Sequence, residues 1–492
     1  MALIVSQAGS QAETRRLQRA AAAGELRRIH AGVYTDDLKS PLEAVTRREL
    51  YPLLAAVAPD AVISHRSALE SGPTKAKELF LTGEYRREIE LPGLLLRIAK
   101  GGRARAQDIR IPTPLGEIHR SSDARALLEN LQVARAPDPE RRRALGQAAV
   151  EQWLERLLAR EGEVALNRVR DQARDAAKDL DLTAEFNRLD SLIGALLGTR
   201  RTKLTHPQAI ARMQGAPYDA QRVDLFQVVA KHLHDHAPRV APAQTEIDQN
   251  LQAFVESYFS NYIEGTEFEL EEAHHIVVEG RPLQYREDDS HDIIGTFNSI
   301  LESVARPVFP TDFAAFLLQL KAWNRQVIFA RAERKPGEIK DEPNRAGNTL
   351  FVAPELVIGT LMKGLELIVA AASPAARAAL AMFVVAEVHP FRDGNGRTAR
   401  LAMNLAFSEA GLTRIIIPTV FREDYLLSLK ALSRNSNPKP YGRMLERASE
   451  FSSWLDYRSQ PTCFEQLKES NALARPEEAK LNLGRAKAVA AK

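Results

Sequence analysis

The sequence predicts a multidomain chain: a winged-helix-like segment and an α+β region, then a helical middle, then a mainly helical C-terminal half with one β-hairpin. Its 492 residues suggest about three domains at roughly 150 residues each. Short β-like runs recur only near the N-terminus, and beyond them apolar residues recur at helical spacing. We therefore expect a winged-helix-like segment at 1–60, an α+β region at 61–120 and a helical region at 121–240. A mainly α domain should follow at 247–457, and a tail at 458–492.

The first segment has the outline of a winged helix. Residues 11–23 read as a helix that Gly24 ends, and the runs 26–29 and 32–34 could pair as a basic hairpin. Five arginines could contact phosphates from here: Arg15, Arg16, Arg19, Arg27 and Arg28. A basic helix that merely covers a sheet explains the same pattern equally well.

Six β-like runs fill the next region, separated by glycine, proline and charged turns. They read AVIS, ELFLT, REIEL, LLLRIA, DIRIP and GEIHR, between Ala61 and Arg120. The pattern then becomes helical, and the segment with Pro238 and Pro242 is the best candidate boundary before the C-terminal half. Within that half, the turn-rich stretch from Asp341 to Val352 could form a projecting hairpin.

The composition excludes several classes of protein. The net charge is +3, and residues 1–120 carry 19 basic against 14 acidic side chains, so only a mild basic bias marks the N-terminal end. The single cysteine, Cys463, excludes an internal disulfide or a cysteine metal cluster and fits a reducing compartment. Neither a signal peptide nor a membrane span is expected. We expect a soluble, cytoplasmic protein.

The stretch VHPFRDGNGRTAR, from Val388 to Arg400, lies between two apolar runs with helical period. A hairpin at Asp-Gly-Asn-Gly would need alternating strands on both sides, and both flanks are helical. A glycine-rich turn that leads into a helix N-terminus presents unpaired N–H groups to an anion. Arg397 and Arg400 lie three residues apart, so both can reach that anion. The loop therefore predicts a phosphate site.

Two further side chains indicate what happens there. Asp393 would repel a phosphate unless a divalent cation lies between them. His389, turned out of the helix end by Pro390, is the group in this loop that can accept a proton near neutral pH. Together they indicate phosphoryl or nucleotidyl transfer. Alone, a His-Pro helix stop or a Gly-Asn-Gly connector would be structural.

The nine residues HPFRDGNGR resemble the signature of the Fic domain family, with the second arginine following as in most members. The resemblance covers about Ile247 to Tyr457. It implies a helical domain that transfers AMP from ATP to a Ser, Thr or Tyr hydroxyl of a target protein. It implies His389 as general base, Asp393 as Mg²⁺ ligand, and an anion site at Gly394, Asn395, Gly396, Arg397 and Arg400. Gly396, where a kinase-like branch has lysine, favours adenylylation.

A second motif, SNYIEG from Ser260 to Gly265, fits the family's inhibitory pattern. In such members the glutamate, here Glu264, pairs with the second arginine, Arg400, and displaces the γ-phosphate. The same glutamate could also orient a water for removal of AMP. The resemblance further implies that Tyr425 lines the adenine side and that the 341–352 hairpin is the flap that holds the target segment by strand addition, although Lys340 replaces the usual arginine.

The N-terminal region is similar to AbiEi-type winged-helix antitoxins and regulators, through LQRAAAAGELRRIHAGVYT and AVISHRSAL. That likeness keeps a second function open: a DNA-binding transcriptional regulator or antitoxin-like protein whose Fic domain senses nucleotide. The partners expected are thus a target protein, DNA as the alternative, and a second copy of the chain in a homodimer; no membrane is expected.

Overall fold

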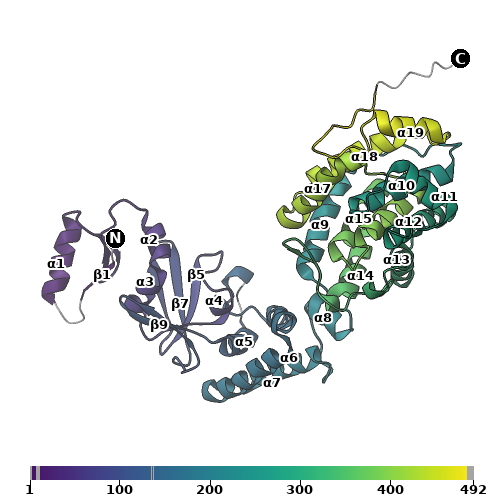
Figure 1. The fold of residues 1–492 in the computed structure, drawn as a ribbon. Helices are drawn as coiled ribbons and strands as arrows, with labels where there is room; N and C mark the ends of the chain where they lie inside the picture. The colour runs from purple at the N-terminus through teal and green to yellow at the C-terminus, as the bar shows by residue number, and fades with distance from the viewer. Residues whose placement is uncertain (1–2, 7–10, 135, 137, 485–492) are drawn as a thin grey trace. The chain divides into compact units, whose positions relative to one another are not determined.

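The computed structural model describes residues 3–6, 11–134, 136 and 138–484. The chain forms two compact units, Met1–Gly215 and Ala216–Lys492, shown from purple to yellow in Figure 1. Among the described residues, no helix has the length and apolar character needed to cross a membrane.

A small antiparallel sheet opens the first unit. β1 (Leu3–Val5) pairs with β3 (Val33–Thr35), which pairs with β2 (Arg27–His30). α1 (Gln11–Ala22) lies between β1 and β2 in the chain and buries Leu17. The expected helix and hairpin are both present. The winged-helix assignment stays a prediction.

All six β-like runs of the next region form strands of one mixed sheet. Its order is β6-β7-β5-β4-β9-β8, with β4 parallel to β9 and β5 parallel to β7. The strands are β4 (Val62–Ile63), β5 (Glu78–Gly83), β6 (Arg87–Leu91), β7 (Leu94–Lys100), β8 (Ile109–Thr113) and β9 (Gly116–Arg120). Alternating apolar side chains of β6 and β7 face a core shared with α2 (Leu42–Arg48) and α3 (Leu50–Val57).

The helical part of the first unit has its own apolar core. Buried leucines and alanines at helical spacing hold it together. The long α6 is kinked at Gly162, whose φ is +77°. After α4 (His65–Leu69), the helices are α5 (Asp123–Leu131), α6 (Gln147–Leu180), α7 (Thr183–Leu196) and α8 (Pro207–Met213).

The second unit is almost wholly helical, as expected. Its helices are α9 (Ala220–Asp235), α10 (Gln249–Ile263), α11 (Leu270–Glu279), α12 (Glu287–Ala305), α13 (Phe313–Val327), α14 (Val357–Val369), α15 (Pro374–Val388), α16 (Asn395–Glu409), α17 (Arg422–Asn435), α18 (Lys439–Trp454) and α19 (Gln460–Glu469). Two adjoining apolar clusters form its core. The residues expected in the tail, from 458 on, begin with α19, whose Cys463 is fully buried.

α15 lies in the middle of this unit (Figure 1), and α16 packs along it. α15 starts at Pro374 behind Ser373, whose hydroxyl accepts from the Ala376 N–H. Its side chains are apolar on nearly every side and buried. A helix that is apolar all round is a core helix, so the loop that joins α15 to α16 starts from the core of the unit.

The division between the units differs from the expected one. The segment with Pro238 and Pro242 lies inside the second unit, because α9 packs on α14 and α15. Phe226 of α9 meets Phe383 of α15 edge to face, with 5.9 Å between the ring centroids. Prolines mark a bend here and not a domain border.

A short hairpin projects from the second unit. β10 (Arg345–Ala346) pairs antiparallel with β11 (Thr349–Leu350), and Gly347 in the turn has a φ of +56°. It falls inside the stretch expected to form a hairpin. Its function as a flap stays a prediction.

Candidate functional site

The loop between α15 and α16 is built as its sequence suggests. α15 ends at His389, whose φ of +54° and ψ of +59° are left-handed. The following Pro390 disfavours a right-handed helical conformation for His389, so the helix stops there. The His389 ring Nδ1 lies 3.0 Å from the Ala386 carbonyl oxygen. A carbonyl only accepts, so Nδ1 carries the hydrogen and Nε2 keeps its lone pair.

His389 is neutral near pH 7. Burial lowers the pKa of His389 to about 4, and Lys340 acts in the same direction. The Ala386 carbonyl, Glu264 and Asp393 oppose that effect. A neutral imidazole with a free Nε2 lone pair can take a proton from a hydroxyl group.

The turn after His389 is held by its own asparagine. The Asn395 amide accepts from the Phe391 N–H at 2.8 Å and donates to the Phe391 carbonyl at 2.8 Å. Asn395 was expected in the anion site, but its side chain is buried and bonded within the loop; as the first residue of α16 it could meet an anion through its backbone N–H. Gly394, with φ +73°, precedes α16 without a side-chain cap in the described chain.

Asn324 of α13 forms hydrogen bonds that hold this turn in place. The sequence did not indicate that contact. Its amide donates to the Asp393 carbonyl at 2.8 Å and accepts from the Gly337 N–H at 2.9 Å. A Cβ atom on Gly394 would lie 3.0 Å from that amide nitrogen. Glycine at 394 thus serves both the left-handed backbone and the close approach of α13.

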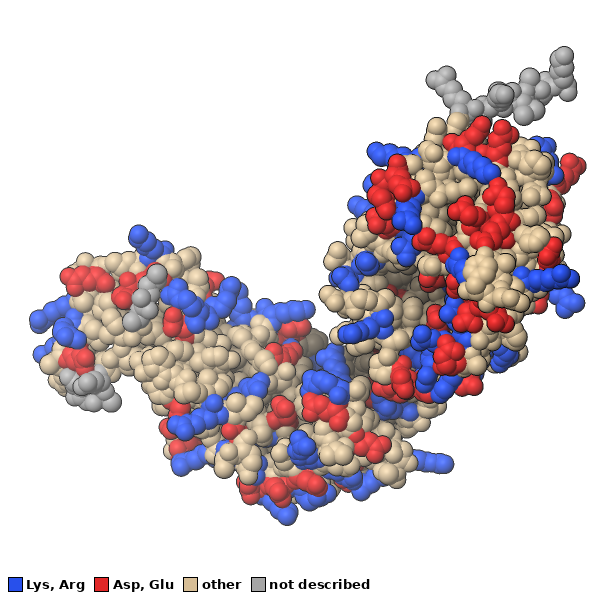
Figure 2. All heavy atoms as spheres, viewed as in Figure 1, with Lys and Arg blue, Asp and Glu red and all other residues tan. Residues whose placement is uncertain are grey.

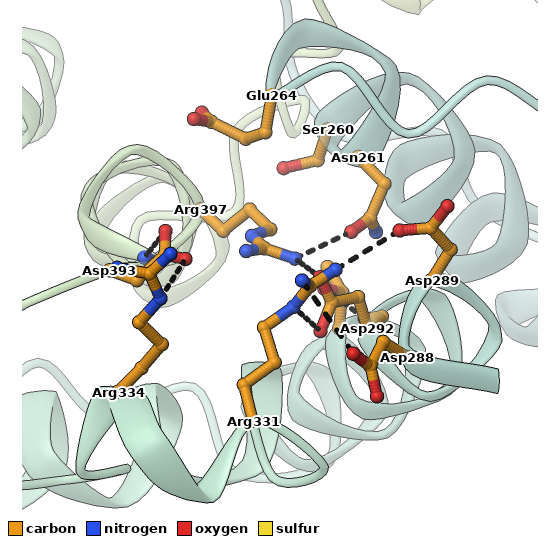
Figure 3. A network of polar contacts seen from close by, with 12 residues as sticks. Ser260, Asn261, Glu264, Asp288, Asp289, Asp292, Arg331, Arg334, Asp393 and Arg397 are labelled. Atoms are coloured by element: carbon orange, nitrogen blue, oxygen red, sulfur yellow. Dashed lines mark hydrogen bonds and ion pairs between the residues drawn. The ribbon is translucent and has the colours of Figure 1, made fainter. Parts of the chain in front are cut away.

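Asp393 lies at the rim, with its side chain 40% exposed. One carboxylate oxygen accepts from the Gly394 N–H at 2.7 Å, and the other is 4.0 Å from the Arg334 guanidinium (Figure 3). Among the described residues no cluster of three metal-ligating side chains occurs. Asp393 is a single carboxylate beside an anion loop, which suits Mg²⁺ only if substrate phosphates and waters complete its shell.

Arg400 and Glu264 form an ion pair of 2.7 Å across the mouth of the loop. The Arg400 guanidinium also donates to the Ser260 hydroxyl at 2.9 Å and the Ser260 carbonyl at 2.8 Å. Burial opposes ionisation of Glu264, but Arg400 and Arg397 outweigh it and lower the pKa of that carboxyl. Glu264 is therefore charged and holds Arg400 at neutral pH.

Gly396 is what lets Glu264 reach this position. A Cβ atom at 396 would lie only 2.1 Å from the Glu264 carboxylate oxygen. Any residue other than glycine at 396 would displace Glu264, since non-bonded heavy atoms do not approach that closely. The same glycine that opens the expected anion site also admits the carboxylate that covers it.

Arg397 points toward Asn261 and Asp292, as Figure 3 shows. Its Nη1 lies 2.7 Å from the Asp292 carboxylate and 3.0 Å from the Asn261 amide oxygen. Arg331 in turn lies 3.0 Å from both Asp292 and Asp289. Sequence reasoning missed these partners because α10, α12 and the turn after α13 lie far from the loop in the chain.

The Nε donor of Arg397 indicates where a ligand could bind. The side chain is 3% exposed, yet its Nε has no hydrogen-bond partner among the described residues. Buried guanidinium donors are normally satisfied. An unsatisfied, permanently charged donor beside a helix N-terminus is the arrangement expected where an anion binds.

Tyr425 was expected to line the adenine side. It is 2% exposed, and its hydroxyl lies 3.4 Å from Arg400 Nη1 while its ring lies below that guanidinium. The structure thus gives it a contact with Arg400. Lining an adenine stays a prediction.

The N-terminal arginines are partly engaged inside the first unit. Arg27 donates to the Ser40 carbonyl at 2.6 Å, and Arg28 to the His30 carbonyl at 3.4 Å. Arg16 pairs with Glu13 at 3.7 Å. Figure 2 shows acidic and basic side chains intermingled on the face it draws, without a separate basic stripe.

Known proteins match the part of the chain that holds this site. Residues 317–407 match the family described as Fic/DOC. The protein adenylyltransferase fic-1 of Caenorhabditis briggsae is 33% identical over 133 residues, 26% of each chain. The protein adenylyltransferase Fic of Drosophila grimshawi is 40% identical over 77 residues, 16% of each chain. The chain thus matches only 26% and 16% of the length of these curated relatives.

A solved structure, Fic-1 residues 134–508 from C. elegans, is 20% identical, with a TM-score of 0.36 over 62% of this chain and 80% of that one. That likeness is too low to establish how the parts are arranged. The matched segment lies within the second unit, so the AbiEi-type likeness of the first unit stays a prediction. The His-Pro-Phe loop, both its arginines and Asn324 lie inside the segment, residues 317–407, that matches the Fic/DOC family.

Proposed function

We propose that the protein is an adenylyltransferase that moves AMP from ATP to a Ser, Thr or Tyr hydroxyl of a target protein. The observation that carries this proposal is the His389–Arg400 loop. There a neutral imidazole with a lone pair on Nε2 adjoins an uncapped helix N-terminus and a buried guanidinium whose Nε has no partner among the described residues. The relatives named protein adenylyltransferase share this domain.

In the proposed reaction the target hydroxyl oxygen attacks the α-phosphorus of ATP. A bond forms between that oxygen and phosphorus, and the bond to the bridging oxygen of the β-phosphate breaks, so pyrophosphate leaves. His389 Nε2 takes the hydroxyl proton. The N–H groups at the start of α16 and the Arg397 guanidinium stabilise phosphate charge, and Arg400 joins them once Glu264 releases it.

Asp393 is the residue that would hold Mg²⁺, since its carboxylate is part-exposed at the rim of the loop. A bound Mg²⁺ would neutralise phosphate charge as it develops. Glu264 is proposed to inhibit the enzyme, because its ion pair occupies the guanidinium that the outer phosphates need.

The test uses the full-length Glu264→Gly protein with host lysate and ATP labelled at either the α- or the γ-phosphate. Label is expected on a protein band from α-labelled ATP alone. His389→Ala in the same background should lower labelling about 10²–10⁴-fold while ATP binding, measured by calorimetry, persists. Transfer of γ-label, or labelling that survives loss of His389, would overturn the proposal.

A further inference from the structure

Phe351, directly after the hairpin, lies flat on the imidazole of His389. The two ring centroids are 3.7 Å apart, and the ring planes differ by 4°. Phe351 is half-buried and lies in the 341–352 stretch expected to form the flap, but no role was expected for its side chain. It is the aromatic contact that the structure gives to the proposed base.

The stack and the hydrogen bond to Ala386 restrain different motions of the imidazole. The bond of 3.0 Å at Nδ1 fixes the direction of the ring edge. The stack fixes the plane of the ring, because tilting the imidazole would break the parallel contact. Nε2 points within that plane, so the face that Phe351 covers is not the edge at which a hydroxyl would approach.

An arginine clamp holds the hairpin against the domain. Arg222 of α9 donates to the Leu350 carbonyl at 2.6 Å and pairs with Glu387, which is two residues before His389 and 4% exposed. Arg434 of α17 donates to the Thr349 hydroxyl at 3.1 Å. The strand that leads to Phe351 is thus tied to the same helix end that carries His389.

The first arm of the hairpin is tied to the loop as well. The Asn344 amide donates to the Phe391 carbonyl at 2.9 Å, and its oxygen accepts from the buried Lys340 ammonium at 2.7 Å. The Phe351 N–H donates back to the Asn344 carbonyl at 3.2 Å. Displacing the hairpin would therefore move Phe351 relative to the imidazole.

We propose that Phe351 is a positioning residue for His389, and that Arg222 holds the hairpin where Phe351 stays stacked on the imidazole. This inference rests on the proposed function, in which His389 is the base. It also gives α9, which lies outside the matched family segment, a part in the reaction.

The stack has a consequence for titration. The groups that face His389 are Lys340, Glu264 and Asp393, and burial has the largest effect on its pKa, which it lowers to about 4. Removing the Phe351 ring admits water to one face of the imidazole, which raises the pKa toward its usual value near 6.5. The neutral, active form is lost as pH falls through the pKa, so the acid limb of the rate profile should move to higher pH.

The experiment follows the His389 signal in full-length protein labelled with ¹³Cε1-histidine, with His389→Gln to assign the peak. In wild type the His389 peak should keep its chemical shift down to about pH 5. In Phe351→Ala the midpoint of the His389 titration should lie at least about one pH unit higher than in wild type. Phe351→Tyr should behave as wild type. Leu350→Ala is the matched control on the same hairpin, because its side chain is 62% exposed and its backbone carbonyl is kept.

Kinetics give the second measurement. In the Glu264→Gly background, Phe351→Ala and Arg222→Met should lower kcat roughly 10- to 100-fold, as a misplaced base does, while KM for ATP stays within about twofold. A His389 titration in Phe351→Ala like that of wild type would overturn the inference. The spectra report on His389 without any turnover, so failure to detect AMP transfer would count against the proposed function alone.

Discussion

Replacing Glu264 by glycine is expected to raise AMP transfer roughly 10- to 30-fold. Glu264 has no role in the proposed transfer of AMP. Its ion pair of 2.7 Å with Arg400 must break before Arg400 can bind a phosphate. The variant removes that step, so ATP no longer competes with a carboxylate already in place.

The magnitude follows from the exposure of the two partners. A hydrogen bond between charged groups contributes about 1.5–3 kcal/mol. The Arg400 side chain is 5% exposed, but that of Glu264 is 33% exposed, so solvent screening argues for the lower end, about 1.5–2 kcal/mol. At about 1.4 kcal/mol for each tenfold change, that range gives the expected gain.

The assay is the initial rate of label transfer from α-labelled ATP below saturation. Glu264→Gln is the matched control, since it keeps the size of the side chain, loses the charge and should give part of the gain. Arg400→Ala should cancel the gain of Glu264→Gly, because both changes act on one interaction and cannot add. If the glutamate also orients a water, removal of AMP from a modified target should disappear in the glycine variant.

A glycine variant no faster than wild type would refute the inhibitory role. So would a gain that persists unchanged when Arg400 is alanine, because the glutamate would then act through some other group. In either case Glu264 would be a helix-end charge, paired but not regulatory.

Three other outcomes are expected. Gly396→Ala should raise transfer by the wild-type enzyme but not by Glu264→Gly, since its methyl group would lie 2.1 Å from that carboxylate; equal rate losses in both backgrounds would mean that the methyl group blocks ATP instead. Asp292→Ala should raise KM for ATP roughly tenfold or more, because Arg397 loses its 2.7 Å partner; an unchanged KM in steady-state kinetics would exclude that positioning role. Arg125→Met should lower the free energy of unfolding of the first unit by about 3–5 kcal/mol, since this 1% exposed side chain pairs with two buried carboxylates. Urea unfolding of the full chain measures this loss of stability, and a loss below about 1 kcal/mol would contradict the prediction.

The sequence predicted the parts of this structure that depend on near neighbours. The six strands of the mixed sheet follow from runs of β-like residues between turns, and the end of α15 follows from Pro390. The ion pair of Glu264 with Arg400 was expected only through the family resemblance. Spacing alone would leave Glu264 a surface charge.

The missed features depend on distant neighbours. Phe351 and His389 are far apart in the chain, and no local period relates a hairpin residue to a helix end. Asn324 and Asp292 look like ordinary polar positions of amphipathic helices until the turn and Arg397 are placed on them. Pro238 and Pro242 indicated a domain boundary from local sequence alone. In the structure the second unit already begins at Ala216, so α9, which precedes these prolines, belongs to it.

The packing of α9 on α14 and α15 also orders events during synthesis. The contacts of the first unit are complete once about 215 residues have emerged, whereas the apolar side of α9 must wait for α15, about 150 residues further on. At roughly 5–20 residues per second, that interval is about 8–30 s. During it Phe226, fully buried in the finished protein, has no partner on α15, so a nascent chain stalled before residue 374 should need a chaperone to cover that side.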